Sequence, residues 1–239
     1  MSQEKHGPRI GREKSSGRRA AALAALLLLG VAVSGTAPAL AGNANPGVLP
    51  PGSRSHGTTY AELSGAWWQW ALAGTTADNP VADTTGVNCG VRQSGSIWFL
   101  AGTFGGGVTR TCQVPSGKAL FFPLVNTVWA NDPGGAATVE ELRELANADL
   151  AGATASAEID GTSVAVTEDY LVESTVFDLA LTADNVLGAP AGTYAPAVAA
   201  GFHLLLAPLS RGPHELHFEG CFANGFCVEA TYHLIVSKS

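Results

Sequence analysis

The stretch SIWFLAGTFGGGVTRTCQVPSGKALFFPLV, residues 96–125, decides the fold class. Three runs within it, SIWFLAG, VTRTCQV and ALFFPLV, are short and rich in β-branched and aromatic residues, which is typical of strands. The glycines of GTFGGGVT have neither the G-x-G-x-x-G spacing nor a following helix, so we interpret them as a hairpin turn between the first two runs. This stretch predicts a β protein.

Strand-like runs continue toward the C-terminus and bring the expected number of strands to about nine: SAEID, TSVAV, YLVESTVFDLALT, FHLLLAP, HELHFEG and CVEATYHLIV. Asp160-Gly161 separates two of them and is a strong signal for a two-residue hairpin turn. Many short strands joined by Gly and Pro turns predict an all-β fold, a single β-sandwich of jelly-roll or immunoglobulin-like character. Residues 183–201 show no strand pattern and predict a long loop that is either functional or mobile.

Two short helices are expected to decorate the sandwich. Thr59 and Glu62 form a T-x-x-E capping box, and Gly74 stands where the helix that follows would end. Apolar residues recur at helical spacing between them and predict one amphipathic helix over residues 60–73, with a shared face of Tyr60, Leu63, Trp67, Trp70 and Ala71. Thr138 and Glu141 repeat the capping box and predict a second helix, with apolar positions Leu142, Leu145, Ala146 and Leu150.

The N-terminal 41 residues have the pattern of a signal peptide. A basic segment, residues 1–19, precedes the apolar run AAALAALLLLGVAV, and Ala39-Leu40-Ala41 predicts cleavage before Gly42. The Arg18-Arg19 pair is compatible with either Sec or twin-arginine export, and the apolar run is too short to serve as a stable membrane anchor. We therefore expect a secreted protein with a flexible lead-in, residues 42–57, and one domain, residues 58–239.

Removal of the signal peptide makes the chain more acidic. Residues 1–41 hold six of the 13 Lys and Arg residues but two of the 20 Asp and Glu residues, so the formal charge falls from −7 to −11. A strongly acidic body repels phosphate backbones, and nucleic acid is therefore not an expected partner. The few remaining basic residues form no cluster in the sequence, which argues against binding to a membrane surface.

The four cysteines all follow the predicted cleavage site: Cys89, Cys112, Cys221 and Cys227. An even number in an exported chain predicts two disulfides, for which three pairings exist. We favour Cys89–Cys112 and Cys221–Cys227, because each pair brackets a predicted turn. No C-x2-C spacing supports a zinc site. His214 and His217 in HELH lack one residue of H-E-x-x-H and point to opposite faces of a strand, so we expect neither a metal nor a cofactor.

Tryptophans supply the candidate binding residues. Trp67 and Trp70 share the apolar face of the first helix, whereas Trp68 lies about 100° around it, either under the loop of residues 75–90 or facing solvent. An exposed indole there would suit stacking on a sugar or an aromatic ring. The other candidates are Trp98 in SIWFLAG, and Trp129 with Asn131 at the turn that includes Pro133-Gly134.

Asp132 and Glu62 are the candidate catalytic acids, because paired carboxylates are the simplest machinery for glycan hydrolysis. Each has an ordinary structural alternative. Glu62 is the capping-box partner of Thr59, and an Asp before Pro-Gly is a common turn former. No G-x-S-x-G elbow or phosphate-binding loop is present.

The segments WWQW, WFLAGTF, CQVPSGKALFFPL and LLLAPLSRGPHELHF resemble exported bacterial proteins of unassigned activity. The resemblance covers roughly residues 60–236 and implies export and a single domain, but no chemistry. The expected sandwich scaffold, the candidate exposed indoles of Trp68 and Trp129 and the lack of a complete catalytic signature predict a secreted recognition module for a glycan, another extracellular polymer or a small molecule. The alternatives are an extracellular enzyme that cleaves polysaccharides or esters at an acidic site including Asp132, and a secreted inhibitor or structural envelope protein.

Overall fold

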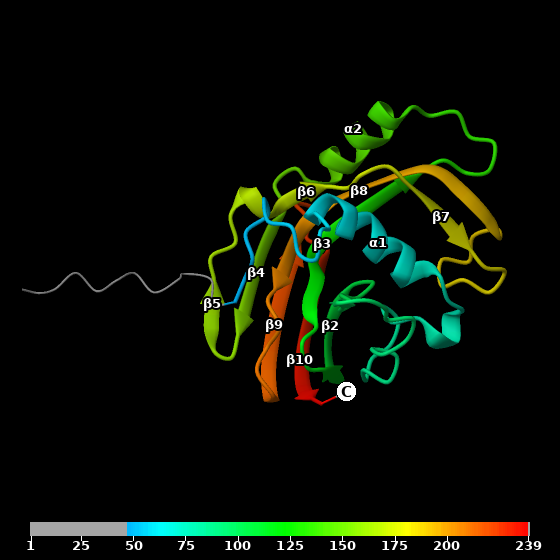
Figure 1. The fold of residues 1–239 in the computed structure, drawn as a ribbon. Helices are drawn as coiled ribbons and strands as arrows, with labels where there is room; N and C mark the ends of the chain where they lie inside the picture. Colours follow the sequence, from blue (N-terminus) through cyan, green and yellow to red (C-terminus); the bar gives the residue numbers. More distant parts are fainter. Residues whose placement is uncertain (1–46, 239) are drawn as a thin grey trace, which may run out of the picture. The chain divides into compact units, whose positions relative to one another are not determined.

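The chain forms two mixed sheets of five strands each and two α-helices in a computed structural model that describes residues 47–238 (Figure 1). Sheet 1 has the order β1-β3-β8-β6, and β7 also pairs with β8. Its strands are β1 (Ile97–Phe99), β3 (Ala119–Ala130), β6 (Leu171–Glu173), β7 (Phe177–Leu181) and β8 (Gly192–Leu206). The predicted signal peptide, its cleavage site and residues 42–46 lie outside the described residues.

Sheet 2 has the order β2-β10-β9-β4-β5. Its strands are β2 (Gly106–Pro115), β4 (Thr154–Ile159), β5 (Thr162–Val164), β9 (Gly212–Cys221) and β10 (Cys227–Ser237). Each sheet contains one parallel pair, β1 with β3 and β2 with β10, and its other pairs are antiparallel. Two short 3-10 helices, η1 (Thr76–Asp78) and η2 (Glu168–Tyr170), lie in the connections.

The two sheets pack against each other as an all-β sandwich, as the sequence predicts. Phe122 of β3 meets Phe218 of β9 with ring centroids 5.1 Å apart. Gly220 of β9 crosses β3 so closely that a Cβ there would lie 2.5 Å from the Leu124 carbonyl oxygen. Sheet 2 buries one face only, because buried and accessible residues alternate along β10.

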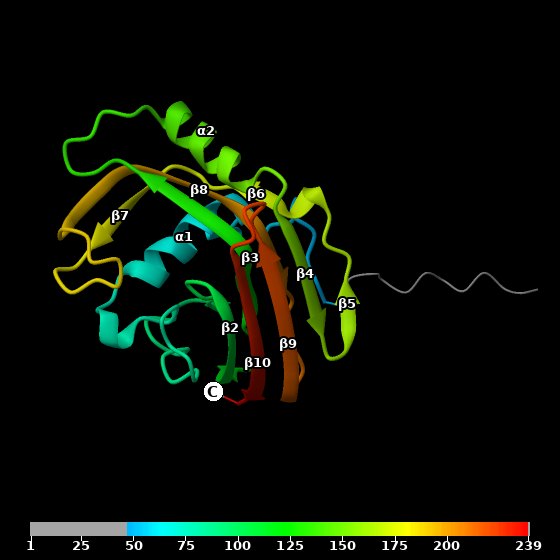
Figure 2. The same cartoon turned by 180° about the vertical axis from the view of Figure 1, so that it is seen from behind.

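Sheet 1 is covered on both faces at its centre. Helix α1 (Tyr60–Leu72) packs against β3, β6, β7 and β8, and helix α2 (Val139–Leu150) packs against β3 and β8. The two helices lie on opposite sides of the β3–β8 pair (Figures 1 and 2). Both predicted capping boxes are formed: Thr59 accepts from the Glu62 N–H, and Thr138 accepts from the Glu141 N–H. The predicted two-residue turn Asp160-Gly161 joins β4 to β5 with positive φ at both residues.

Two sequence predictions about the connections are wrong. The FGGG stretch is not a hairpin turn, because β1 and β2 belong to different sheets, and the chain crosses from one sheet to the other there. Residues 192–201 are not a loop but the first part of β8, a central strand that is continuously buried from Ala197 onward. Their many alanines hide the strand signal, yet small side chains suit a strand that helices cover on both faces.

The predicted disulfides, Cys89–Cys112 and Cys221–Cys227, are both present. Two disulfides indicate an oxidising environment outside the cytoplasm. Neither α1 nor α2, the α-helices of residues 47–238, has the length and apolar character needed to cross a bilayer. Part of the predicted lead-in is attached to the domain: Val48 is buried, and the Leu49 N–H donates to the Leu205 carbonyl at 2.8 Å.

Candidate ligand-binding site

Trp68 and Trp129 lie on different faces of sheet 1, so they do not form one site. The Trp129 indole N–H and the Thr127 hydroxyl both donate to the Asp149 carboxylate of α2, at 2.8 and 3.0 Å. Strand alternation places Asn126 and Val128 on the opposite face, where they line a hollow together with Trp68 of α1. Thr127 lies at the border between this hollow and the one that Asp149 lines. Trp129 does not line this hollow.

The other sequence candidates have structural surroundings of their own. Asn131 is buried and closes the loop after β3, because its side-chain amide exchanges two hydrogen bonds with the Ala137 backbone. The Glu62 carboxylate accepts from the Thr59 N–H and hydroxyl, both at 2.8 Å, and these bonds lower its pKa. Asp132 is exposed in the turn after β3. Trp98 is buried in the core, with its side chain 8% exposed.

The hollow at Trp68, which we call the Trp68 pocket, has a volume of about 420 Å³. It lies between α1, the middle of β3, the loops that hold residues 81, 102–104 and 187, and the tip of the β9–β10 hairpin. Its lining contains no Asp, Glu, Lys, Arg or His. The lining residues are Trp67, Trp68, Val81, Gly102, Thr103, Phe104, Pro123, Leu124, Val125, Asn126, Thr127, Val128, Leu187, Phe222, Phe226 and Val228.

The lining of the Trp68 pocket has a buried inner wall and an exposed outer edge. Trp67 and Leu124 are almost fully buried and form the inner wall. Phe104, Leu187 and Phe226 are exposed by 47, 48 and 46%, and we call them the rim. They come from three segments far apart in the sequence. Phe104 and Phe226 are the two exposed phenylalanines of residues 47–238, and both belong to this rim.

The rim at the β9–β10 hairpin is held by covalent and backbone contacts. The Cys221–Cys227 disulfide closes the hairpin, and the Phe222 N–H donates to the Phe226 carbonyl at 2.9 Å. The Phe222 and Phe226 rings contact each other with centroids 6.0 Å apart. Gly105 packs against the Phe226 ring at φ +116°, where a Cβ would lie 2.9 Å from Cε2. The FGGG stretch thus has a packing role, which its glycine content alone did not reveal.

A buried arginine holds the inner side of the pocket together. Arg110 of β2 is 1% exposed, and its guanidinium donates to four backbone carbonyls, at distances of 2.6 to 3.0 Å: Val81, Asp83, Ala101 and Gly102. It also donates to the Tyr232 hydroxyl at 2.8 Å and lies over that ring. Because Val81 and Gly102 line the pocket, Arg110 positions two of its walls. Alternation with Cys112 and Val114 along β2 is the sequence signal for its burial.

A second, more open hollow of about 430 Å³ adjoins the Trp68 pocket and shares Thr127, Phe222 and Phe226 with it. Asp149 lines this hollow. Because the Asp149 carboxylate already accepts from Thr127 and Trp129, it serves to fix α2 on β3. This arrangement gives Trp129 a structural role.

Ser210, His214 and Asp160 have the residue types of a hydrolytic triad, with Ser210 Oγ 3.2 Å from His214 Nε2 and Asp160 Oδ2 2.7 Å from His214 Nδ1. His214 does not have the role of a general base, however, because such a base must accept the proton of the serine hydroxyl. Burial lowers the pKa of His214, but the bonds to Asp160 and to the Ser210 carbonyl outweigh it, so the net pKa is raised. Nε2 lies 3.0 Å from that carbonyl, where it donates a proton instead of accepting one from the hydroxyl. The cluster clamps the β4–β5 turn onto β9.

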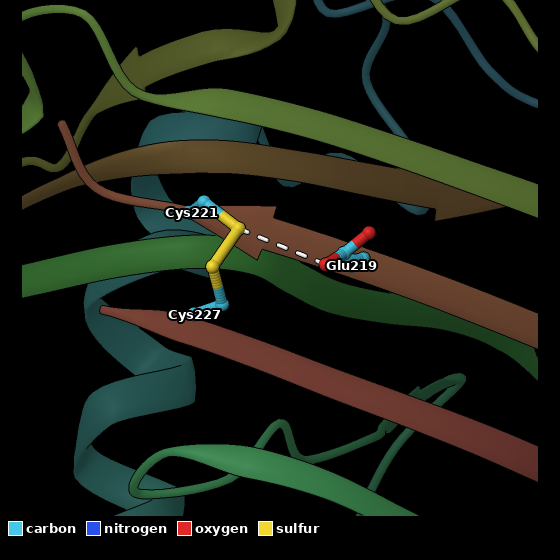
Figure 3. Close-up of side chains that lie close together, drawn as sticks. All are labelled: Glu219, Cys221 and Cys227. Atoms are coloured by element: carbon cyan, nitrogen blue, oxygen red, sulfur yellow. Dashed lines mark hydrogen bonds between the residues drawn. A yellow bond between two sulfur atoms is a disulfide. The ribbon is translucent and has the colours of Figure 1, made fainter. Parts of the chain in front are cut away.

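Among residues 47–238, one group of potential metal ligands comes together: Glu219, Cys221 and Cys227 (Figure 3). The two sulfurs are joined in a disulfide, and a metal requires the thiolate form of cysteine. The Glu219 carboxylate lies 3.7 Å from Cys221 Sγ, a van der Waals contact because a disulfide sulfur carries no proton. The group is therefore not a metal site.

His203 is a core residue. It is fully buried and stacked on Phe121 with centroids 5.3 Å apart, and burial lowers the pKa of its imidazole to about 4. Nδ1 lies 2.8 Å from the Gly201 carbonyl, so the neutral ring donates there. Among the described residues, His203 Nε2 has no hydrogen-bond partner.

Comparisons with protein-family models, with curated proteins and with solved structures found no match to this chain.

Proposed function

We propose that this protein is a secreted recognition module and that its ligand binds in the Trp68 pocket. The ligand is a glycan or another extracellular polymer, or a small molecule. The observation that carries the proposal is the rim: three exposed apolar side chains from distant segments surround one hollow of about 420 Å³. Single exposed apolar residues are ordinary, whereas a group of them around a hollow of this size marks a binding site.

Secretion is supported by two independent features. The N-terminal pattern of a basic segment, an apolar run and an A-x-A site is typical of exported proteins. The two disulfides are typical of proteins that fold in an oxidising compartment.

A binding function without catalysis is supported by the chemistry of the lining. The pocket has no carboxylate, imidazole, thiol or serine hydroxyl that would act as an acid, base or nucleophile. Neither of the sequence-predicted acids, Asp132 and Glu62, lines it.

The proposal is tested with the mature, oxidised protein and a panel of extracellular glycans, both bare and acylated. Binding is followed by intrinsic fluorescence and by calorimetry. We expect Trp68→Ala to weaken binding about tenfold or more, since loss of one large apolar contact removes roughly 1.5–3 kcal/mol. Trp129→Ala is the matched control, because it removes an equal side chain from the opposite face of sheet 1.

Two results would contradict the proposal. Equal weakening by Trp68→Ala and Trp129→Ala would mean that the pocket is not the site. Turnover of a polysaccharide or ester by the purified protein would favour an enzyme. Because Trp68 packs on Trp67, thermal unfolding is measured for each variant, and Phe226→Ser provides a second test at a rim residue that is nearly half exposed.

A further inference from the structure

We infer that the part of the ligand that enters the Trp68 pocket is an apolar group of about a dozen non-hydrogen atoms, and that the polar remainder stays outside the rim. This inference rests on the proposed function and specifies the chemistry that the same site recognises. Fragments such as an alkyl or acyl chain, or an aromatic ring, meet the description.

The lining offers almost no hydrogen bonds to a sugar ring. It has three polar side chains, Thr103, Asn126 and Thr127. The Thr103 hydroxyl donates to the Gly106 carbonyl at 2.9 Å, and the Thr127 hydroxyl donates to Asp149, so both are engaged within the protein.

Two nitrogens of the lining have no partner, Asn126 Nδ2 and Trp68 Nε1, and both are shielded from solvent. A sugar ring carries several hydroxyls, each of which loses its water on entry and needs a replacement bond. Two shielded donors do not provide them. The pocket therefore favours an apolar group, which loses no hydrogen bonds when it leaves water.

The volume of the pocket limits the size of the group that enters it. At about 30 Å³ for each group the size of a water molecule, about 420 Å³ holds roughly a dozen non-hydrogen atoms. This is the lower part of the volume range for small-ligand sites. An apolar group that fills the hollow would also cover the rim, whose side chains are otherwise in contact with water.

The test is a series of n-alkyl β-glucosides, from methyl to decyl, below their critical micelle concentrations. The sugar is constant, so any trend in affinity reports the chain. We expect no measurable binding of the methyl compound and a three- to fourfold gain in affinity for each added CH₂, until the pocket is full. Phenyl and naphthyl glucosides form a second arm that compares a ring with a chain.

Val128→Phe gives a sharper readout, because Val128 lines the pocket and is partly accessible. The larger side chain should shorten the chain length at which affinity levels off while leaving the gain for each CH₂ unchanged before that point. Trp129→Phe, on the opposite face of β3, is the control that should not change this length. Loss of stability alone would not produce such a shift.

Three outcomes would overturn the inference. Equal affinity for all chain lengths, still lowered by Trp68→Ala, would show that the pocket recognises the sugar, and the proposed function would stand. If affinity rises with alkyl chain length but neither Trp68→Ala nor Val128→Phe changes this rise, the alkyl chain binds elsewhere on the protein. That result would contradict the proposed function as well. Dimers in sedimentation experiments that persist at saturating octyl glucoside, and that Phe226→Ser separates, would show that a second copy covers the rim in place of the apolar group.

Discussion

Replacement of Arg110 by methionine should destabilise the protein strongly, although the residue carries no ion pair with a carboxylate. Methionine preserves the apolar stem but removes the donors for four buried carbonyls. One of these, the Ala101 carbonyl, keeps the Tyr232 hydroxyl as a donor at 2.8 Å. The other three lose the bonds that Arg110 gave them, at about 1–3 kcal/mol each. Relief from burying a guanidinium offsets part of that cost, so we expect a net loss of about 3–5 kcal/mol.

The assay is equilibrium urea unfolding of the oxidised protein, followed by tryptophan fluorescence. Arg143→Met is the control, because Arg143 forms a partly exposed ion pair with Glu173 at 3.0 Å and donates to one backbone carbonyl, that of Ser174, at 2.9 Å; together these contacts are expected to contribute at most about 2 kcal/mol. Arg110→Lys should remain destabilised, since an ammonium group does not reproduce the planar set of donors. A loss below about 1 kcal/mol for Arg110→Met would refute the reasoning, because the carbonyls would then be satisfied without the guanidinium.

Two further predictions concern pH and the rim. The raised pKa of His214 means that its pairing with Asp160 stabilises the fold fully below the ordinary histidine pKa of 6.5 and is lost as pH rises through the folded-state pKa. The thermal midpoint should therefore decrease as pH is raised above neutral, and the lost stability should be less than about 1 kcal/mol. Asp160→Asn should flatten this pH dependence; the same pH dependence in the variant and in the unchanged protein would disprove the pairing. Gly105→Ala should displace the Phe226 ring and weaken alkyl glucoside binding, whereas Gly106→Ala, also at positive φ but with nothing within 4 Å of its Cβ, should lower stability without that effect on binding.

Local signals in the sequence predicted local structure well. The two capping boxes gave the starts of α1 and α2 because a cap is formed by residues three positions apart. The cysteine spacing led to the observed pairing, since each disulfide closes a short segment of chain. The alternation in CVEATYHLIV predicted β10, whose second face is exposed and polar enough to show the period.

Predictions failed where structure depends on partners distant in the sequence. The start of β8 has weak strand propensity, and its pairing with β7 and β3, which no local pattern encodes, makes it a strand. The FGGG stretch has the composition of a turn, but composition does not identify the strand with which the next segment pairs. β2 pairs with β10, more than a hundred residues away.

The same limit applies to the site. Tryptophan content drew attention to Trp68 and Trp129, but the face on which each ring lies depends on how α1 and α2 pack against sheet 1. The rim residues Phe104 and Leu187 had no signal of their own, because an isolated apolar residue in a loop is common. Only Phe226 had a local indication, in that it lies beside a cysteine at the tip of a hairpin.

The arrangement around the rim argues for a ligand on energetic grounds. A phenyl ring at the tip of a hairpin is normally free to fold back and lose contact with water. Here the Cys221–Cys227 disulfide and the packing of Gly105 on Phe226 hold the ring at the mouth of the hollow. A wall that is fixed before binding lowers the entropy cost of ordering it around a ligand. The chain therefore keeps an apolar surface in water and fastens one side of it with a disulfide and a ring contact, a combination that costs solubility unless another molecule covers the surface.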